Sequence, residues 1–481
     1  MKIKVSDYIA EKLVEAGIQH LFMVTGGGAM HLNNSLGKNP GLQCIFNHHE
    51  QASAIAAESY ARLTGKIAAL CVTSGPGGTN AITGVYGAYV DSIPMLIISG
   101  QIRYDTHVLS TGLPLRQLGD QEIDIIRMVP GITKYAVMVT HAEEIRYHVE
   151  KALYLAKAGR PGPCWLDIPM NIQGAMVDPE QLKAYDPKED LEEAPIPEPK
   201  LIREIIDRIR SAKRPVLFAG SGIRLSGAHA DFLKLVEALN IPVVTAWNAH
   251  DNIPDDHPLY CGRPGTVGDR AGNFIVQNSD LLFVLGCRLN IRQIGYSWQT
   301  FAREAYKIIV DIDPAELKKP TLKPDLPIHA NVSVLMKEIL KELKGQKLSA
   351  KEEWIHWCLA RKELYPVVLK EYWKNKGLIN PSCFMQKLGE HLPEGQITVT
   401  GDGTACVCAF QAMKIKKGQR LYTNSGCAAM GYDLPAAIGA CFGSGKQKII
   451  CLAGDGSLQM NIQELQTVAH HKLPIKIFVL N

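Results

Sequence analysis

The sequence predicts an α/β protein built from three doubly wound domains, each with a parallel sheet covered by helices. Short apolar runs rich in β-branched residues alternate with amphipathic helical patterns along the chain, as parallel sheets require. The length of 481 residues is too great for one hydrophobic core, since domains usually hold roughly 100–200 residues. Two polar stretches, at 176–200 and near 345–353, divide the chain into three parts.

The first part carries four apolar runs that predict strands, with helices between them. The expected strands are 20–24, 68–73, 95–99 and 163–168, and helices are expected over 50–63 and 142–158. The segment 176–200 is acidic and rich in proline without apolar periodicity, so it predicts an exposed linker.

Two further α/β parts follow the linker. Strands are expected at 215–223, 241–247, 281–287 and 307–313 in the second part, and at 396–403, 448–456 and 475–480 in the third. Glycine-rich loops fall at the carboxyl ends of strands in the first and third parts. Ligands bind at that edge of open parallel sheets, so these loops are the expected binding regions.

The composition is that of an ordinary globular protein. The 52 basic and 48 acidic residues give a net charge of +4, which offers no reason to expect nucleic acid or an anionic membrane as a partner. The N-terminus lacks an apolar signal core, and the apolar runs are far shorter than the roughly 20 residues of a membrane-spanning helix. Twelve scattered cysteines without paired CxxC motifs predict buried reduced thiols, so we expect a cytoplasmic protein.

A glycine-rich turn, GDGS at 454–457, lies between an apolar strand and a helical stretch. Glycines let the backbone approach a phosphate closely, and the N–H groups at a helix start favour an anion. Asp455 stands where it can hold a hard cation that bridges phosphate oxygens, a role that suits Mg²⁺. GDG alone is a weak pattern, and an ordinary strand-to-helix turn explains it equally well.

Two stretches of the first part combine glycines or small residues with polar ones. Within 47–65, Glu50 opens an alanine-rich helix, although a glutamate there usually interacts with the helix dipole alone. The loop SGPGGTN at 74–80 can receive a flat polar ring or a phosphate, but it lacks the lysine of a P-loop. The triple glycine at 26–28 lacks GxGxxG spacing, which argues against a nicotinamide oxidoreductase.

The combination of HEQ at 49–51, GPGGTN at 75–80 and GDGS at 454–457 is more specific than any one of them. With these motifs the chain resembles the acetolactate synthase branch of the thiamine diphosphate-dependent enzymes, essentially from end to end. The most telling stretches are HEQASAIAAESYARLTGK, VTSGPGGTNAITGVYGAYVDSIPM, GRPGPCWLDIP, VDIDPAE, GYDLPAAIGA and GDGSLQMNIQELQTV. The resemblance implies decarboxylation of a 2-oxo acid such as pyruvate, with transfer of the two-carbon unit to a second carbonyl compound.

The resemblance also implies the domain plan and an oligomer. It assigns 1–180 to a pyrimidine-binding domain, 195–345 to a central flavin-type domain and 355–481 to a diphosphate-binding domain. The family binds its cofactor between the first of these domains in one subunit and the third in another. At least a homodimer is therefore expected, and a homotetramer fits as well.

The same resemblance implies roles for individual residues. Glu50 matches the activating glutamate, whose carboxyl group hydrogen-bonds a ring nitrogen of the cofactor's aminopyrimidine, and a water-poor site raises its proton affinity. Gln121 matches a glutamine that faces the reacting centre, and Asp455 matches a Mg²⁺ ligand. The other residues implied to bind thiamine diphosphate are Gly27, Pro76, Asn80, Met430, Gly454, Gly456 and Ser457.

The middle part resembles the flavin-binding domain of this branch. Arg160, the stretch 262–288, and Asp311 and Asp313 match positions that contact FAD there. Related decarboxylases carry the same middle fold without flavin. The resemblance therefore leaves FAD open as a third bound group beside thiamine diphosphate and Mg²⁺.

The chain departs from the family pattern at three places. Asp120 stands where the family has a phenylalanine before the reactive glutamine, and GTA at 403–405 replaces a GQH-type diphosphate contact. His31, Asn33 and Asn34 make the region after the triple glycine unusually polar, which suits a hydroxylated acceptor. The alternatives are an enzyme that adds a two-carbon branch to a keto sugar nucleotide and a simple 2-oxo acid decarboxylase.

The sequence ends at Asn481, which matches the first of two adjacent asparagines in the family's cofactor motif. The second asparagine of that motif ligates magnesium. We therefore expect the diphosphate-binding domain to be C-terminally incomplete. A truncated, inactive binding protein is the alternative outside catalysis.

Overall fold

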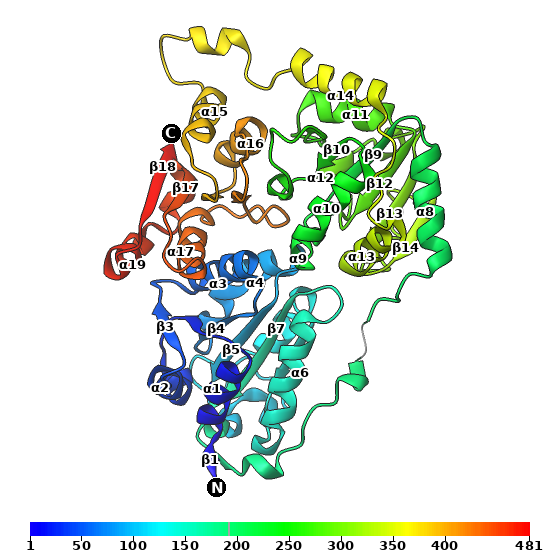
Figure 1. The fold of residues 1–481 in the computed structure, drawn as a ribbon. Coiled ribbons are helices and arrows are strands. Elements are labelled where there is room, and N and C mark those ends of the chain that lie inside the picture. The colour runs from blue at the N-terminus through cyan, green and yellow to red at the C-terminus, as the bar shows by residue number, and fades with distance from the viewer. Residues whose placement is uncertain (191–192) are drawn as a thin grey trace. The chain divides into compact units, whose positions relative to one another are not determined.

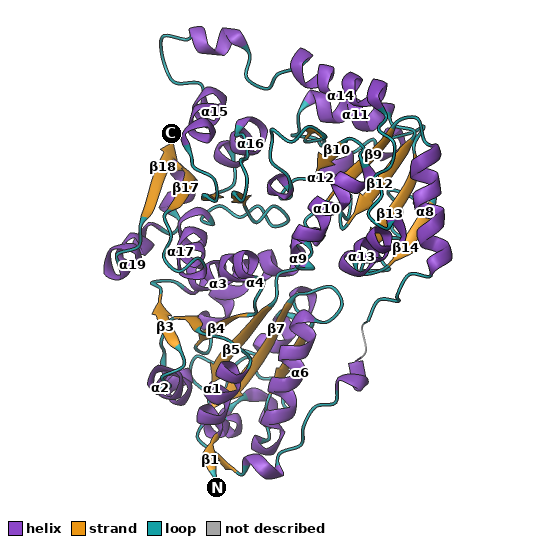
Figure 2. Ribbon diagram, in the orientation of Figure 1, coloured by secondary structure: helices purple, strands orange, loops and turns teal. Residues whose placement is uncertain are grey.

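The computed structural model describes residues 1–190 and 193–481, which include two parallel sheets of six strands each and one two-stranded ribbon (Figures 1 and 2). Residues 191–192, inside the predicted linker, lie outside the described residues. The chain forms two compact units. One combines the described residues up to Asp190 with Asn424–Val479, and the other contains Glu193–Thr423. The predicted α/β class with parallel sheets is confirmed.

The first unit is built on a wholly parallel sheet with the strand order β3-β2-β4-β5-β7-β6. Its strands are β2 (His20–Met23), β3 (Gln43–Phe46), β4 (Ala68–Val72), β5 (Met95–Gln101), β6 (Tyr135–Met138) and β7 (Pro163–Pro169). Every residue of β4, β5 and β7 is buried, because helices cover both faces. The helices α1 (Val5–Glu15), α2 (Met30–Lys38) and α6 (Ile145–Lys157) cover one face, and α3 (Glu50–Thr64) and α4 (Pro76–Val90) cover the other.

The alanine-rich helix α3 packs between α4 and α17 (Asp433–Gly443). A Cβ placed on Gly84 of α4 would lie 2.5 Å from Ala54 Cβ, and one on Gly439 of α17 would lie 2.0 Å from the Ala56 carbonyl oxygen. The helices approach this closely only because glycine has no side chain. Residues 424–479 are thereby packed directly onto the first unit's helical layer.

The remaining elements of the first unit are short. They are α5 (Ile125–Met128), α7 (Met170–Gln173), α18 (Asp455–Gln459), α19 (Leu465–His471), β17 (Ile449–Gly454), β18 (Ile475–Leu480) and the antiparallel ribbon of β1 (Ile3–Lys4) with β8 (Met176–Val177). α18 directly follows β17, as the strand–turn–helix reading of GDGS predicts.

The predicted linker is more ordered than expected in its first half. Its first two residues pair with β1, and Leu182 and Tyr185 are buried. The Tyr185 ring packs edge-on against Tyr147, and its backbone N–H donates to Glu150. The prediction of a wholly exposed linker is therefore wrong for this stretch, because its few apolar side chains find partners on α6.

The second unit contains another parallel sheet, ordered β11-β10-β9-β12-β13-β14. Its strands are β9 (Pro215–Ala219), β10 (Val243–Thr245), β11 (Tyr260–Gly262), β12 (Leu281–Leu285), β13 (Tyr306–Asp311) and β14 (Leu326–His329). The helices α8 (Pro199–Ser211), α10 (His229–Leu239) and α13 (Val332–Leu343) cover one face, and α11 (Arg270–Asn278) and α14 (Glu352–Leu364) cover the other. The unit also holds α9 (Gly222–Leu225), α12 (Ile291–Ile294), α15 (Pro381–His391), α16 (Thr404–Ala412) and the parallel pair β15 (Ile397–Thr400) and β16 (Arg420–Tyr422).

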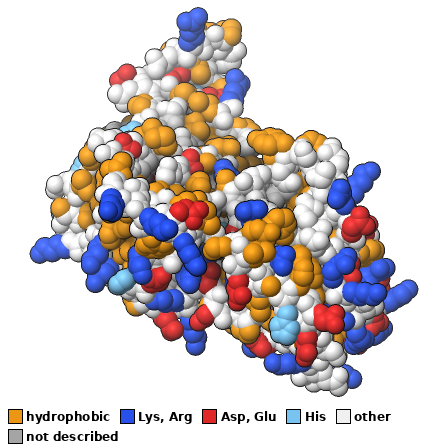
Figure 3. All heavy atoms as spheres, turned by 90° about the horizontal axis from the view of Figure 1, so that it is seen from above, with side chains coloured by type: hydrophobic (Ala, Val, Ile, Leu, Met, Phe, Trp, Pro, Cys, Tyr) orange, Lys and Arg blue, Asp and Glu red, His pale blue; other side chains and the backbone are white. Residues whose placement is uncertain are grey.

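The surface agrees with the balanced composition. Figure 3 shows basic and acidic side chains interspersed over the visible face. Throughout the described part of the chain, no helix combines the length and apolar character needed to cross a membrane.

The close contact between α3 and α17 predicts that a side chain at Gly439 destabilises the folded protein. Gly439→Ala should lower the free energy of unfolding by about 1–3 kcal/mol, because the added methyl group meets backbone rather than a movable side chain. Thermal unfolding monitored by circular dichroism measures this. Gly37→Ala is the matched control, because a Cβ there has no neighbour within 4 Å and the residue is helical. Equal midpoints for the two variants would contradict the packing argument.

Candidate cofactor and active site

Two glycine turns meet at the carboxyl edge of the first unit's sheet. β2 and β4 are neighbours, so the loops that follow them lie side by side. A Cβ on Gly26 would lie 2.4 Å from Thr73 Cγ2, and one on Gly28 would lie 2.6 Å from Ser74 Oγ. Gly27 is exposed between them. The structure thus places the predicted residue Gly27 beside the loop that leads into Pro76.

Gln121 reaches the same loop from another part of the chain. Its φ of 59° lies in the left-handed region, which is uncommon for a residue other than glycine. Its carbonyl oxygen would lie 2.7 Å from a Cβ on Gly75, which itself has a φ of 58°. Only glycine fits at position 75 for both reasons. The predicted reactive glutamine is therefore next to the turn that starts α4.

Glu50 is the first residue of α3 and is oriented by α4. Asn80 Nδ2 donates to Glu50 Oε2 over 3.0 Å. The turn before the helix is capped by His49, whose ring nitrogen accepts the Gln51 N–H at 3.1 Å. The structure brings together Glu50 and Asn80, two residues that the sequence predicts to contact the same ring of the cofactor.

The candidates from the last part of the chain form a second cluster, in the same unit. Ser457 Oγ donates to Asp433 and accepts the Gly431 N–H at 2.8 Å. A Cβ on Gly456 would lie 3.2 Å from Met430 Cε, so the methionine side chain lies over this glycine. Burial raises the pKa of Asp433. The turn before α17 and the start of α18 are thus one hydrogen-bonded structure.

Asn461 and Glu464 connect this second cluster with the start of α3. Asn461 Nδ2 donates to the Gly431 carbonyl at 2.8 Å and to Gln51 Oε1 at 3.2 Å. Buried Glu464 accepts from Asn47 Nδ2 and from the His48 N–H, both at 2.8 Å. Sequence reasoning missed both residues, although they stand inside NIQELQTV. In this chain, the two predicted halves of the site lie in one compact unit.

Asp455 is exposed at the first position of α18, directly after Gly454. In residues 1–190 and 193–481, no three His, Cys, Asp or Glu side chains are grouped as a metal site. A single exposed carboxylate beside a glycine turn fits Mg²⁺, which takes one or two protein carboxylates and completes its shell with phosphate and water. The donor set therefore fits a metal that arrives with a diphosphate.

A buried polar network lies behind Gln121. Asp167 is fully buried at the end of β7, where Ser99 Oγ donates to it at 2.6 Å and Gln101 Nε2 donates at 3.1 Å. Trp165 Nε1 in turn donates to Ser99 Oγ at 2.8 Å. Burial raises the pKa of Asp167 to about 7. None of these residues was singled out by the sequence, because each sits inside an apolar strand.

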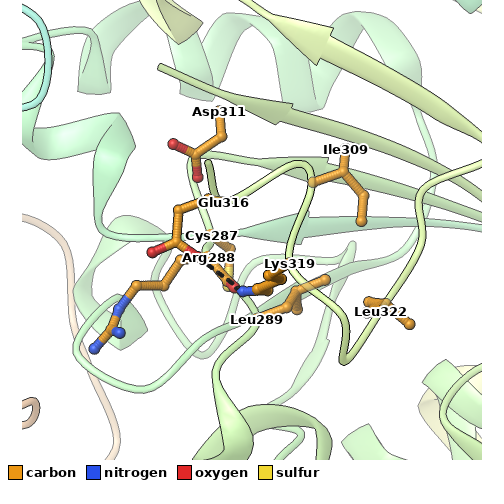
Figure 4. A pocket seen from close by; sticks show the side chains of 8 residues that line it. All are labelled: Cys287, Arg288, Leu289, Ile309, Asp311, Glu316, Lys319 and Leu322. Atoms are coloured by element: carbon orange, nitrogen blue, oxygen red, sulfur yellow. Dashed lines mark hydrogen bonds and ion pairs between the residues drawn. The ribbon is translucent and has the colours of Figure 1, made fainter. Parts of the chain in front are cut away.

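The residues predicted to contact flavin fall in both units. Arg160 is in the first, where its Nε donates to Ser92 Oγ at 2.8 Å. Asp311 and Asp313 are in the second, where Asp311 Oδ1 accepts the Asp313 N–H at 3.0 Å. Asp311 lines a small pocket at the ends of β12 and β13, together with Arg288, Glu316 and Lys319 (Figure 4). Acceptor carboxylates beside cationic groups at strand ends match the chemistry of a ribose with its phosphates.

Three family models match the chain. The N-terminal TPP binding domain of the thiamine pyrophosphate enzymes matches residues 3–147, the central domain matches 202–343 and the C-terminal TPP binding domain matches 401–481. The chain therefore belongs to the thiamine pyrophosphate enzyme family.

Within that family the chain is similar to acetolactate synthases. It is 33% identical to the acetolactate synthase isozyme 1 large subunit of Escherichia coli strain K12, over 99% of this chain and 81% of that protein. It is 32% identical to the probable acetolactate synthase large subunit of Methanocaldococcus jannaschii, over 100% of this chain and 80% of that protein. It is also 32% identical to acetolactate synthase 2, chloroplastic, of Zea mays, over 99% of this chain and 73% of that protein.

The raised pKa of Asp167 makes the stability depend on pH. An unfolded aspartate titrates near pH 4, so between about pH 4 and 7 the folded state binds more protons than the unfolded state. The contribution of Asp167 to stability is therefore complete below about pH 4 and is lost as the pH rises through about 7. Asp167→Asn should remove this slope, so its thermal midpoint relative to wild type should rise between about pH 5 and 8. Parallel midpoint–pH curves for the two proteins would refute the assignment.

Proposed function

We propose that this protein is a thiamine diphosphate- and Mg²⁺-dependent enzyme that decarboxylates a 2-oxo acid, pyruvate first of all, and transfers the two-carbon unit to a second carbonyl compound. The observation that carries the proposal is the hydrogen bond from Asn80 to the Glu50 carboxyl group, on the helix that follows the glycine turn against Gln121. It brings together residues that the resemblance assigns to the reacting end of the cofactor. The shared name of the relatives, acetolactate synthase, supports the reaction.

When bound, thiamine diphosphate supplies the nucleophilic carbon and the electron sink for the loss of carbon dioxide. The chain's own residues bind and orient it. The Glu50 carboxyl group, held by Asn80, would hydrogen-bond a ring nitrogen of the aminopyrimidine and exchange a proton with it. Gly27, Pro76 and Met430 would hold the rings.

The diphosphate end is assigned to the start of α18. Backbone N–H groups of Gly454, Gly456 and Ser457 at a helix N-terminus are suited to an anion, and Asp455 would hold a Mg²⁺ that neutralises it. Gln121 faces the substrate beside Gly75.

The polar residues after the triple glycine are only partly engaged within the chain. Asn33 Nδ2 donates to the Gly26 carbonyl at 3.2 Å, and a Cβ on Gly174 would lie 3.0 Å from His31 Nε2. The buried Oδ1 of Asn33 has no hydrogen-bond partner among the described residues, and Asn34 is exposed. The keto sugar nucleotide therefore stays the alternative acceptor, and product analysis with both kinds of carbonyl compound distinguishes it from a small acceptor.

Three broader assignments belong to the same proposal. The functional domains are 1–180, 195–345 and 355–481, which the matched ranges support. The active form is at least a dimer, as the family resemblance implies. The twelve cysteines, ten of them buried, support a reducing compartment such as the cytoplasm.

FAD binding in the central domain is also proposed, on the strength of the Asp311 pocket. The purified protein should show flavin absorbance, and Asp311→Ala should lower the flavin content because a ribose acceptor is lost. Absorbance spectroscopy after gel filtration measures both. A colourless wild-type protein would remove FAD from the proposal.

The central test of the proposal is product analysis. With thiamine diphosphate and Mg²⁺ present, pyruvate should release carbon dioxide and yield acetolactate, and added aldehydes should yield the corresponding hydroxyketones. Mass spectrometry with labelled pyruvate identifies the products. Glu50→Gln should reduce turnover by about 100-fold or more, because general acid–base groups contribute roughly 10²–10⁴-fold.

The control variant for this test is Glu11→Gln, which changes the same side chain on the exposed face of α1. It should leave turnover unchanged. Wild-type turnover in Glu50→Gln, with an unchanged thermal midpoint, would refute the role of Glu50. Absence of any product from the wild type would refute the proposed reaction.

A further inference from the structure

We propose that Glu122, Gln101 and Asp167 are positioning residues that fix the backbone of Gln121 on both sides and so hold its side chain for the reaction. The inference rests on the proposed function, because it assigns Gln121 to the reacting centre. All three residues are buried, whereas Gln121 is exposed. None of the three is among the residues implied by the family resemblance.

Glu122 fixes the segment on the N-terminal side of Gln121. Its Oε2 accepts the Gly119 N–H at 2.7 Å, and its Oε1 accepts the Val108 N–H at 3.2 Å. One carboxylate thereby closes the loop that runs from Val108 to Glu122. A carboxylate that accepts two backbone N–H groups makes charge-assisted bonds, which are stronger than bonds between neutral groups.

Gln101 fixes the segment on the C-terminal side. Its Nε2 donates to the Ile123 carbonyl at 2.8 Å and to Asp167 Oδ2 at 3.1 Å, while its Oε1 accepts the Ile102 N–H at 3.0 Å. A flipped amide would turn its oxygen toward two acceptors and its NH₂ group toward a donor. Asp167 therefore sets the orientation in which Gln101 can hold Ile123.

Between these two attachments, Gln121 is held in a conformation that it would not adopt freely. Its φ of 59° places the carbonyl oxygen against Gly75, at the turn that leads into α4 and Asn80. A left-handed non-glycine residue is maintained when its surroundings determine it, and such residues gather at functional sites. The bonds to Val108, Gly119 and Ile123 provide that constraint.

A double-mutant cycle tests the inference. Gln101→Ala and Glu122→Gln should each lower kcat/KM for pyruvate about tenfold or more, since a displacement of about 1 Å can cost roughly 100-fold. In a Gln121→Ala background the same changes should lower it less than about twofold, because they act through a side chain that is already gone.

Two variants serve as matched controls. Gln419 is a buried glutamine that likewise bridges a carbonyl and a backbone N–H, those of Pro393 and Lys416. Glu150 likewise accepts a backbone N–H, that of Tyr185, from a side chain on α6. Gln419→Ala and Glu150→Gln remove comparable bonds elsewhere and should leave kcat/KM within about twofold of wild type.

Hydrogen exchange measured by mass spectrometry gives a readout independent of turnover. In the cofactor-free protein, the Val108 and Gly119 amides should exchange faster in Glu122→Gln, and not in Glu150→Gln. Unchanged exchange, or effects of Gln101→Ala and Glu122→Gln that are undiminished in Gln121→Ala, would overturn the positioning role while leaving the proposed function intact. A wild-type protein without turnover would instead refute the proposed function and the catalytic meaning of this arrangement.

Discussion

The candidate site depends on the close approach of α3 to its two neighbouring helices. Gly84 and Gly439 let backbone and small side chains meet where any larger residue would force the helices apart. Glu50 begins the central helix, Asn80 lies on α4, and Met430 stands just before α17. The relative position of Glu50 and Asn80, which the proposal assigns to one site, is therefore set by helix packing, which is rigid, rather than by the loops that carry the glycines.

Buried charges reinforce the same packing farther along α3. Arg62 donates to Glu58 of its own helix at 2.8 Å and to Asp91 at 2.8 Å, and the Tyr432 hydroxyl donates to Glu58 at 2.8 Å. Buried charges are tolerated only when they are paired and hydrogen-bonded. Tyr432 directly follows Gly431, which is held by Ser457 and Asn461. The turn that carries Met430 is thus fixed from two directions.

The sequence predicted the central strands well and the polar contacts poorly. β4, β5 and β7 are buried on both faces, so they appear as continuous apolar runs that cannot be mistaken for loops. The edge strands β3 and β6 were missed, because their residues are partly exposed and the apolar run is lost. The hydrogen bond between Asn461 and Gln51 joins residues 410 positions apart, and no local sequence pattern predicts such a pair. Resemblance supplied the candidate cofactor residues, whereas the residues that hydrogen-bond to them or to their neighbours appeared only with the fold.

The departures from the family pattern lie near the glycine turns after β2 and β4. Asn33 Nδ2 donates to the Gly26 carbonyl in the loop after β2, and the His31 ring lies next to Gly174. Asp120 and Gln121 are neighbours in the sequence and both are exposed. The Gln121 carbonyl oxygen lies against Gly75. Asp120 is a carboxylate where the family resemblance implies a phenylalanine, so this position differs from that pattern in charge as well as in size. Because Glu122 fixes the backbone directly after this pair, the charge of Asp120 is presented from a defined place rather than from a mobile loop. Under the proposed function, the departure at position 120 therefore concerns the substrate side of the site rather than the residues assigned to the cofactor.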